Sequence, residues 1–387
     1  MDYKENPAFG ASEPLGPRGS HSHTFIEADA GYDGWGAMAV GDFDLDGRPE
    51  FVTGGKGGGF FHLYDFNIQT GSWDRHVITR ELSPQVGAAA TDLDGDGRPE
   101  IVCGEWGPRL LWLACPTGQL DRWEYHSVYE GLTNPHDVFA GDLNGDGRDE
   151  IVVRNKDGAL LLFRPPADPT EPWPVQVIAD RLDGDGTVAA PIGRSNVLDI
   201  VTNDGWFENV DGDGSTWVRH PFAPKELDLH PECRVIVGDL DGNGNPVAVI
   251  TESEIPNARM FLLRYVGPKK PWEPQLLIDR SDRICGMHSL QLADLDNDGK
   301  LDIFTAEMEN SRTDGVNARP RWWYLSQSTD GSWRKHVLLD ANLGSHTASA
   351  ADFDGDGNLE IVGKVWRANK VNGADGRNHV DFLKLSF

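Results

Sequence analysis

The sequence has little cysteine, no long hydrophobic run and no helical periodicity. Its 387 residues include 4 cysteines, none in a Cys-x-x-Cys pair. That is too few for a disulfide scaffold, so we expect reduced, buried thiols. No apolar stretch approaches the length of a membrane-spanning helix. The polar first twenty residues hold no signal-peptide core, so we expect an extracellular location if a signal peptide has been removed and a cytoplasmic one if Met1 is native.

Basic residues are also scarce, with Lys+Arg 35 against Asp+Glu 62 and a formal net charge of -27. Such a charge opposes binding to nucleic acid and to anionic membranes. The sequence contains no phosphate-binding loop, no nucleophile elbow and no dinucleotide fingerprint. These absences exclude the common nucleotide-dependent and serine-hydrolase classes.

The sequence instead contains an acidic repeat, which we call the acidic phrase, in six copies. The copies are GDFDLDGRPEFV, TDLDGDGRPEIV, GDLNGDGRDEIV, GDLDGNGNPVAV, ADLDNDGKLDIF and ADFDGDGNLEIV. Their first acids are Asp42, Asp92, Asp142, Asp239, Asp294 and Asp352. The wide gap between Asp142 and Asp239 contains a worn seventh copy, PIGRSNVLDIV, which keeps an acid at Asp199. The chain is therefore built from seven units of about fifty residues.

Each unit has a second landmark, a strand led by tryptophan such as WDRHVI or WRKHVL. The landmark is missing at the C-terminus, but SHTFIE near residue 22 has the right character. Short β-forming runs lie between Gly, Pro and Asp turns. We therefore predict an all-β fold, a seven-bladed β-propeller closed by an N-terminal outer strand, with a solenoid as the alternative. Residues 1–19 should be a flexible segment, and 20–387 a monomeric propeller.

Acidic side chains recur at positions 1, 3, 5 and 9 of the repeated phrase. Hard oxygens converging from nine residues suit Ca²⁺, although Asp and Gly also simply make good turns. The predicted structural Ca²⁺ ligands are Asp42, Asp44, Asp46, Glu50, Asp92, Asp94, Asp96, Glu100, Asp142, Asn144, Asp146, Glu150, Asp294, Asp296, Asp298, Asp302, Asp352, Asp354, Asp356 and Glu360. The copy at Asp239 is weaker because it has Asn243 and Val247.

The phrases DLDGDGRPEIV and DFDGDGNLEIV resemble the FG-GAP or VCBS repeats of integrin-type, bacterial and fungal propellers. The resemblance extends over nearly the whole chain and implies the propeller fold and its calcium loops. The same scaffold hosts adhesion modules, lectins and enzymes. Among the enzymes, the resemblance extends to rhamnose–glucuronate lyases, ulvan lyases and the propeller of aldos-2-ulose dehydratase.

Candidate chemistry lies six residues before each marker acid, which we call the funnel position. In a propeller this position opens on the central funnel, on the face opposite the acidic loops. Three of the 12 histidines occupy it, and the predicted catalytic residues are His136, His288, His346 and the adjacent Arg234. They fit acid–base chemistry, an additional metal held by three imidazoles, or structural histidines. Four other histidines follow the landmark tryptophan by three residues, and we predict that they pack on outer strands.

Loops on the funnel face carry aromatic and charged side chains suited to pyranose rings. The predicted substrate-binding residues are Trp35, Lys56, Glu105, Trp106, Arg154, Glu307, Arg312 and Trp366. We therefore predict a carbohydrate lyase that acts by β-elimination on a uronate-containing saccharide. The alternatives are a sugar dehydratase of the aldos-2-ulose type and a non-enzymatic propeller that binds glycans or proteins.

Overall fold

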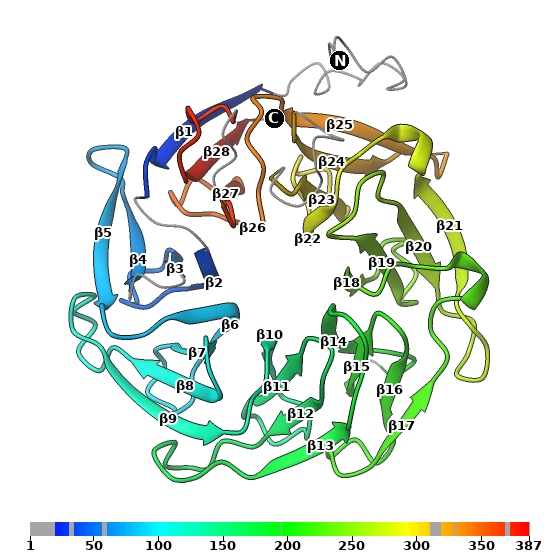
Figure 1. The fold of residues 1–387 in the computed structure, drawn as a ribbon, viewed down its shortest axis with the longest axis horizontal. Coiled ribbons are helices and arrows are strands. Elements are labelled where there is room, and N and C mark those ends of the chain that lie inside the picture. Colours follow the sequence, from blue (N-terminus) through cyan, green and yellow to red (C-terminus); the bar gives the residue numbers. More distant parts are fainter. Residues whose placement is uncertain are drawn as a thin grey trace. The chain divides into compact units, whose positions relative to one another are not determined.

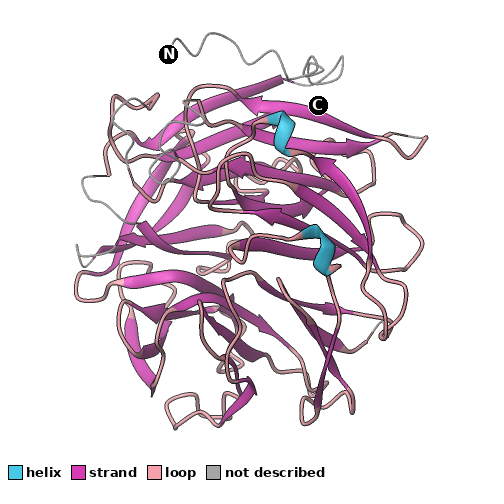
Figure 2. Cartoon of the chain, turned by 45° about the vertical axis from the view of Figure 1, so that its right-hand side comes forward, coloured by secondary structure: helices cyan, strands magenta, loops and turns pink. Residues whose placement is uncertain are grey.

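The computed structural model describes residues 20–30, 35–55, 60–194, 196–309, 319–328, 330–367 and 372–386. These residues form strands β1 to β28 and two short 3-10 turns, η1 (Lys225–Leu227) and η2 (Arg280–Asp282) (Figure 2). Within the described residues, no helix is long and apolar enough to cross a membrane. The predicted flexible segment 1–19 lies outside the described residues. The all-β prediction is confirmed.

The chain divides into two compact units, which we describe separately. Unit 1 contains the described residues within 1–31, 223–351 and 357–387, and unit 2 those within 32–222 and 352–356. Both are built from four-stranded antiparallel sheets in which strands consecutive in the sequence are neighbours.

Unit 2 contains an eight-stranded sheet and two four-stranded sheets. The first is made of β2 (Trp35–Gly41), β3 (Glu50–Gly55), β4 (Phe60–Asn67), β5 (Ser72–Thr79), β6 (Pro84–Thr91), β7 (Glu100–Glu105), β8 (Arg109–Ala114) and β9 (Glu124–Glu130). It is two four-stranded sheets joined by a parallel bridge between Met38 and Gly87. The second sheet contains β10 (Pro135–Gly141), β11 (Glu150–Asn155), β12 (Leu160–Phe163) and β13 (Val175–Ala179). The third contains β14 (Thr187–Pro191), β15 (Leu198–Thr202), β16 (Trp206–Asn209) and β17 (Trp217–His220).

Unit 1 contains three four-stranded sheets. They are β18 (Cys233–Gly238), β19 (Val247–Glu252), β20 (Met260–Arg264) and β21 (Glu273–Ile278); β22 (Met287–Ala293), β23 (Asp302–Glu307), β24 (Trp322–Gln327) and β25 (Trp333–Leu339); and β26 (Thr347–Ala351), β27 (Glu360–Lys364), β28 (Val380–Ser386) and β1 (Ser20–Glu27).

The N-terminal strand completes the C-terminal sheet. β1 pairs antiparallel with β28 from Ser20 opposite Ser386 to Glu27 opposite Val380. Figure 1 draws the two strands side by side, β1 in blue and β28 in red. This is the position predicted for SHTFIE, because the last repeat supplies only three strands of its own.

The apolar cores lie between successive sheets of each unit. Every residue of the second strands β3, β11, β19 and β23 is buried. In unit 2, Val52 and Leu63 of one sheet share a cluster with Ile101 and Leu111 of the next. Strands buried on both faces read as continuous apolar runs rather than alternating ones. The worn fourth repeat still folds as a full sheet, β14 to β17, because its strands keep this pattern.

Candidate functional site

The funnel positions lie where the first strand of each sheet begins. In unit 1, Cys233 opens β18, His288 is the second residue of β22, and His346 directly precedes β26. In unit 2, His136 is the second residue of β10 and Asp185 precedes β14. All five side chains are buried.

In unit 1, His288 and His346 form a stacked imidazole pair. Their ring centroids are 3.7 Å apart with an interplanar angle of 29°. Nδ1 of His288 lies 2.5 Å from the carbonyl oxygen of His346. A carbonyl only accepts, so this nitrogen carries the proton and Nε2 is left with its lone pair. The contact fixes both the tautomer and the orientation of the His288 ring.

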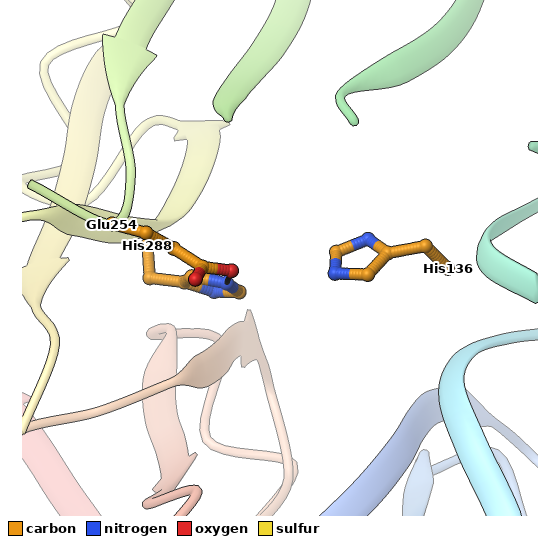
Figure 3. A group of neighbouring side chains, drawn as sticks. All are labelled: His136, Glu254 and His288. Carbon is orange, nitrogen blue, oxygen red and sulfur yellow. Dashed lines mark ion pairs between the residues drawn. The ribbon is translucent and has the colours of Figure 1, made fainter. Parts of the chain in front are cut away.

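Arg234 and Glu254 lie beside the other nitrogen of His288. The Arg234 Nη2 atom lies 2.9 Å from Nε2 and 3.2 Å from Nδ1, so it sits over the face of the imidazole ring. A carboxylate oxygen of Glu254 lies 3.8 Å from Nε2, and Figure 3 shows this carboxylate beside the imidazole. His288 therefore has a guanidinium and a carboxylate as its two charged neighbours.

A second group of polar residues surrounds His346. Its ring lies 5.0 Å from that of Trp366, and its backbone N–H donates to the carbonyl of Lys364 at 2.7 Å. Burial lowers the pKa of Lys364 to about 7, with the nearby Glu309 opposing the shift. Burial raises the pKa of Glu309 to about 7. Unit 1 therefore holds an amine and a carboxyl that both titrate near neutral pH.

Glu254 and Glu309 were missed by the sequence analysis. The signal that could have found them is a repeated Glu-x-Glu at the end of the second strand, Glu252-Ser253-Glu254 and Glu307-Met308-Glu309. Two glycines let these segments approach the next sheet. A Cβ on Gly286 would lie 2.1 Å from the carbonyl oxygen of Ser253, and one on Gly344 would lie 2.4 Å from the backbone nitrogen of Glu309. Each glycine precedes a funnel histidine by two residues.

In unit 2, His136 lies in a chain of alternating charges. Its Nδ1 is 3.1 Å from Asp137 and its Nε2 is 3.3 Å from Asp185. Lys156 lies 3.3 Å from the same Asp185 oxygen. His136 is thus held between two carboxylates, one of which also pairs with a lysine.

Glu105 and Glu307 belong to a repeated Glu–Arg clamp. Arg109 Nε donates to Glu105 at 2.7 Å, Arg259 Nη2 to Glu252 at 2.6 Å, and Arg321 Nε to Glu307 at 3.0 Å. Each glutamate ends the second strand of its sheet, and each arginine stands at the start of the third. These contacts account for Glu105 and Glu307 as ties between strands, and we leave both out of the substrate site.

Arg154 is also held by the fold. It is fully buried, and its guanidinium donates to the carbonyls of Gly158, Asp183 and Gly184 at 3.3, 3.0 and 3.1 Å. Trp106 is partly exposed after β7, and Trp35 begins β2. Lys56 and Arg312, two other predicted substrate-binding residues, lie outside the described residues.

The histidines that follow the landmark tryptophans pack on outer strands, as predicted. The rings of His126, His220 and His336 stack on Trp112, Trp206 and Tyr324 of the third strands, with centroids 4.6, 4.5 and 4.4 Å apart. His76 pairs with Asp121 at 3.0 Å. The four cysteines are buried free thiols, which also agrees with the sequence.

The acidic loops gather their carboxylates. One oxygen from each member lies within 4.8 Å of the others in four groups of described residues: Asp42, Asp44, Asp46 and Glu50; Asp92, Asp94 and Asp96; Asp294, Asp296 and Asp302; and Asp352, Asp354 and Asp356. Each loop turns back on its first acid. Gly47 N–H donates to Asp42 at 2.9 Å, and Gly97 N–H to Asp92 at 3.0 Å.

The acid at position 9 is buried and tied to the backbone of position 2. Phe43 N–H donates to Glu50 at 2.7 Å, and Leu295 N–H to Asp302 at 3.0 Å. Burial raises the pKa of Glu50 to about 9 and that of Asp302 to about 8. It also raises the pKa of Glu100 and of Glu150 to about 7. A cation in these loops would offset the cost of burying ionised carboxylates.

Three loops differ from this pattern. In the third, the amide of Asn144 donates to Asp146 at 3.0 Å and to Glu150 at 2.5 Å. In the fifth, Arg264 Nε donates to Asp241 at 2.9 Å. In the fourth, which has lost its other acids, Arg194 lies 3.8 Å from Asp199. In the fourth and fifth loops an arginine therefore pairs with an acid of the loop.

Comparison with known proteins identifies the repeat and supports the fold. Residues 92–153 and 294–363 match the FG-GAP-like repeat family. The solved structure of BBS1N in complex with ARL6DN aligns at 10% identity and a TM-score of 0.55, covering 92% of this chain and 95% of that one. This likeness shows the fold alone.

Two further structures align less closely. A putative oxidoreductase (glucose dehydrogenase) from Thermus thermophilus aligns at 13% identity and a TM-score of 0.45, covering 94% of this chain and 100% of that one. The biofilm matrix protein Bap1 of V. cholerae aligns at 11% identity and a TM-score of 0.43, covering 95% and 70%. No curated protein sequence matches the chain. The chain thus has FG-GAP-like repeats and a propeller-like fold of four-stranded sheets.

Proposed function

We propose that this protein is a carbon–oxygen lyase that cleaves a uronate-containing saccharide by β-elimination. The observation that carries the proposal is the pairing of Arg234 with His288 at 2.9 Å, with the ring held by the His346 carbonyl. A neutral imidazole is a suitable base near neutral pH. A guanidinium is the preferred partner of a carboxylate. The two groups that the reaction needs are therefore adjacent in unit 1.

Each residue has its own role in the proposed elimination. Arg234 binds the uronate carboxylate and stabilises the negative charge that develops on it. His288 Nε2 takes the proton from the carbon beside that carboxylate. The electron pair forms a carbon–carbon double bond as the bond to the glycosidic oxygen breaks, and that oxygen takes a proton. Glu309, whose pKa burial raises to about 7, is a buried carboxyl of unit 1 suited to supply it.

The test is the absorbance of the unsaturated product, which uronate elimination generates and hydrolysis does not. His288→Gln and Arg234→Lys should each lower turnover by about 10²-fold or more, the usual scale for a lost acid–base group. His76→Ala, on an outer strand, is the control and should leave turnover unchanged. Uronate oligosaccharides that stay intact would remove the lyase assignment. Loss of water from a neutral keto sugar would then favour the dehydratase, and binding without product the non-enzymatic module.

His136 is proposed as a separate catalytic candidate within unit 2. Its ring nitrogens lie 3.1 Å from Asp137 and 3.3 Å from Asp185, so the imidazole can exchange a proton with either carboxylate. His136→Gln should lower turnover without changing the melting temperature by more than the His76 control. We also propose that the four-stranded sheets close as a seven-bladed propeller. The pairing of β1 with β28 supports this because it joins the two ends of the chain in one sheet.

We propose in addition that the acidic loops bind structural Ca²⁺. The gathered carboxylates and the buried acid at position 9 fit a hard cation with oxygen ligands. Isothermal titration of the chelated protein measures the stoichiometry. Heat that is equal for Ca²⁺ and Mg²⁺, or no heat, would contradict the proposal.

A further inference from the structure

Arginines link the acidic loops of unit 2 to one another. The first, second and third loops are the acidic phrases that begin at Asp42, Asp92 and Asp142, and each has an arginine at position 7. Arg98 of the second loop donates from Nη1 to the carbonyl of Phe43 in the first loop at 3.2 Å. Arg148 of the third loop donates from Nη2 to the carbonyl of Leu93 in the second loop at 3.1 Å. The first and second loops are thus each held by the arginine of the loop that follows.

The residue at position 2 is held from two sides. Its carbonyl accepts from the arginine of the following loop, and its N–H donates to the acid at position 9 of its own loop. Phe43 N–H lies 2.7 Å from Glu50, and Leu93 N–H lies 2.8 Å from Glu100. Both position-2 side chains are buried. Because the held carbonyl belongs to the peptide unit that leads to position 3, the arginine fixes the backbone between two acids of the preceding loop.

Each of these arginines is also tied to its own loop through its backbone. The N–H of Arg98 donates to Asp96 at 2.8 Å, and the N–H of Arg148 donates to Asp146 at 2.9 Å. In EF-hand calcium loops, position 7 also supplies a backbone carbonyl as a ligand. Ordering of one loop therefore places the guanidinium that reaches the loop before it.

The worn fourth repeat keeps the contact with a different side chain. It has Val197 at position 7, and the carbonyl of Leu143 in the third loop accepts from Asn209 Nδ2 at 2.6 Å instead. The loops of unit 1 have no arginine at position 7, where they carry Asn245, Lys300 and Asn358. The arginine series therefore runs through the first three loops, which all belong to unit 2.

We propose that the first three acidic loops are coupled in series, so that ordering of one loop orders the loop before it. The inference rests on the proposed function for Ca²⁺ as the ligand that orders them. A loop already held at position 2 loses less conformational freedom when its acids converge on a cation. We therefore expect positive cooperativity among the first three loops, and no such coupling to the loops of unit 1.

The first experiment needs no cation. Amide hydrogen exchange is measured by mass spectrometry on the chelated full chain. Arg98→Met should accelerate exchange in residues 42–50 by about tenfold or more, the factor for one hydrogen bond to a charged group. Arg148→Met should have its effect in residues 92–100 instead. Arg122→Met, at an exposed arginine on the turn before β9, is the matched control and should change neither rate.

Residues 294–302 of unit 1 report any general loosening of the fold. Their exchange should stay at the parent rate in Arg98→Met and in Arg148→Met. An unchanged rate in residues 42–50 of Arg98→Met, or an equal acceleration in residues 294–302, would overturn the proposal.

The second experiment adds Ca²⁺ and measures the concentration at which each loop gains half of its protection. Asp94→Ala removes an acid of the second loop. It should raise this midpoint for residues 42–50 by about tenfold, within the usual 5- to 150-fold range of coupling between sites, and should not shift it when Arg98→Met is also present. Asp44→Ala should raise the midpoint of residues 92–100 by the same factor, because coupling is reciprocal. Midpoints that ignore the neighbouring loop would overturn the proposal.

Arg98→Lys guards against a fold defect, because it keeps the positive charge and a donor. Exchange in residues 42–50 should be slower than in Arg98→Met, at an unchanged melting temperature. The parent rate in both variants would overturn the coupling. If no loop gains protection with Ca²⁺, the proposed calcium binding fails by itself, and the exchange rates of the chelated protein still decide whether the loops are coupled.

Discussion

Nδ1 of His288 donates to the backbone carbonyl of His346 at 2.5 Å, and the two rings stack 3.7 Å apart. The hydrogen bond uses the backbone of His346, whereas the stacking uses its side chain. Replacing His346 therefore removes only half of the support for His288. The two histidines share one repeat position, but the proposed function gives them different roles, with His288 as the base and His346 as the residue that positions it.

The first prediction separates these roles. His346→Ala should lower kcat by about tenfold, since a neighbouring loss of packing costs less than the loss of the base itself. His288→Gln should lower kcat by about 10²-fold or more. KM should change little in either variant because Arg234 remains. Steady-state kinetics on a uronate oligosaccharide measure both constants, and equal kcat losses would show that His346 reacts directly.

The fold was predictable because its units repeat the same local chemistry. The acidic phrase marks the turn between the first and second strands, and the tryptophan marks the fourth strand. Even the worn repeat could be placed, because the strand around Asp199 kept its apolar pattern. In the structure, Asp199 accepts a hydrogen bond from Ile192 N–H at 3.2 Å, as the acids at position 9 do in the other loops. Local turn chemistry and burial are properties of short segments, so a single sequence contains them.

The partners of the site residues were less predictable. The Glu–Arg clamps have no fixed spacing: Arg109 follows Glu105 by 4 residues, and Arg321 follows Glu307 by 14. The hairpin loop between the second and third strands varies in length while the clamp geometry is kept. Glu105 and Glu307 therefore resembled loop residues open to a ligand. Likewise, no spacing rule places Glu254 beside His288 of the next sheet.

The second prediction concerns the metal. Chelation should lower the melting temperature by many degrees, because a cation at one hundred times its Kd stabilises the fold by about 2.7 kcal/mol per site. Asp44→Asn should remove one site from the titrated stoichiometry, and added Ca²⁺ should restore the melting temperature of the chelated parent. Asp213→Asn, outside the acidic phrases, is the control. A melting curve insensitive to chelator would contradict this prediction.

The third prediction tests whether the clamps are structural. Glu307 is 0% exposed and also accepts from Trp323 Nε1 at 2.9 Å and from Cys285 N–H at 3.0 Å. Glu307→Gln leaves Arg321 without its counter-charge, so the free energy of unfolding should fall by about 3–5 kcal/mol. Denaturant titration measures the loss.

Glu105→Gln is the matched control for the clamp, since its partner Arg109 has 32% side-chain exposure. Solvent screening should limit its loss to about 1 kcal/mol or less. KM for the saccharide should stay at the parent value in both variants. An increase of KM in Glu307→Gln at unchanged stability would return Glu307 to the substrate site.

The fourth prediction concerns the closing strand. Asp381 of β28 lies between two imidazoles, 2.8 Å from His23 Nε2 on β1 and 2.5 Å from His379 Nδ1. Asp381→Asn removes the charge that attracts both rings, so β1 should detach more often. Limited proteolysis near residue 27 should accelerate by about tenfold, the factor for one charge-assisted hydrogen bond. Asp330→Asn, on an exposed turn, is the control, and equal cleavage rates would show that backbone pairing alone holds β1.

The last prediction follows from Lys364, which is fully buried at the end of β27. Burial lowers its pKa from 10.5 to about 7, with Glu309 opposing and Arg234 adding to the shift. Between these two pH values the unfolded chain binds a proton at Lys364 that the folded protein does not. The free energy of unfolding must therefore rise as the pH increases from about 7 toward 10.5.

Lys364→Met should remove this contribution. At pH 7 the variant should be more stable than the parent by about 1–4 kcal/mol, as when an apolar side chain replaces a buried charge. The difference should shrink as the pH approaches 10, because the amine is then increasingly neutral in both states. Denaturant unfolding of the two proteins at pH 7 and pH 10 measures it, and Lys269→Met, at an exposed lysine outside the acidic phrases, corrects for general alkaline effects. A variant less stable than the parent at pH 7 would show that the ammonium ion of Lys364 is stabilised by its neighbours, with the opposite sign of pH dependence.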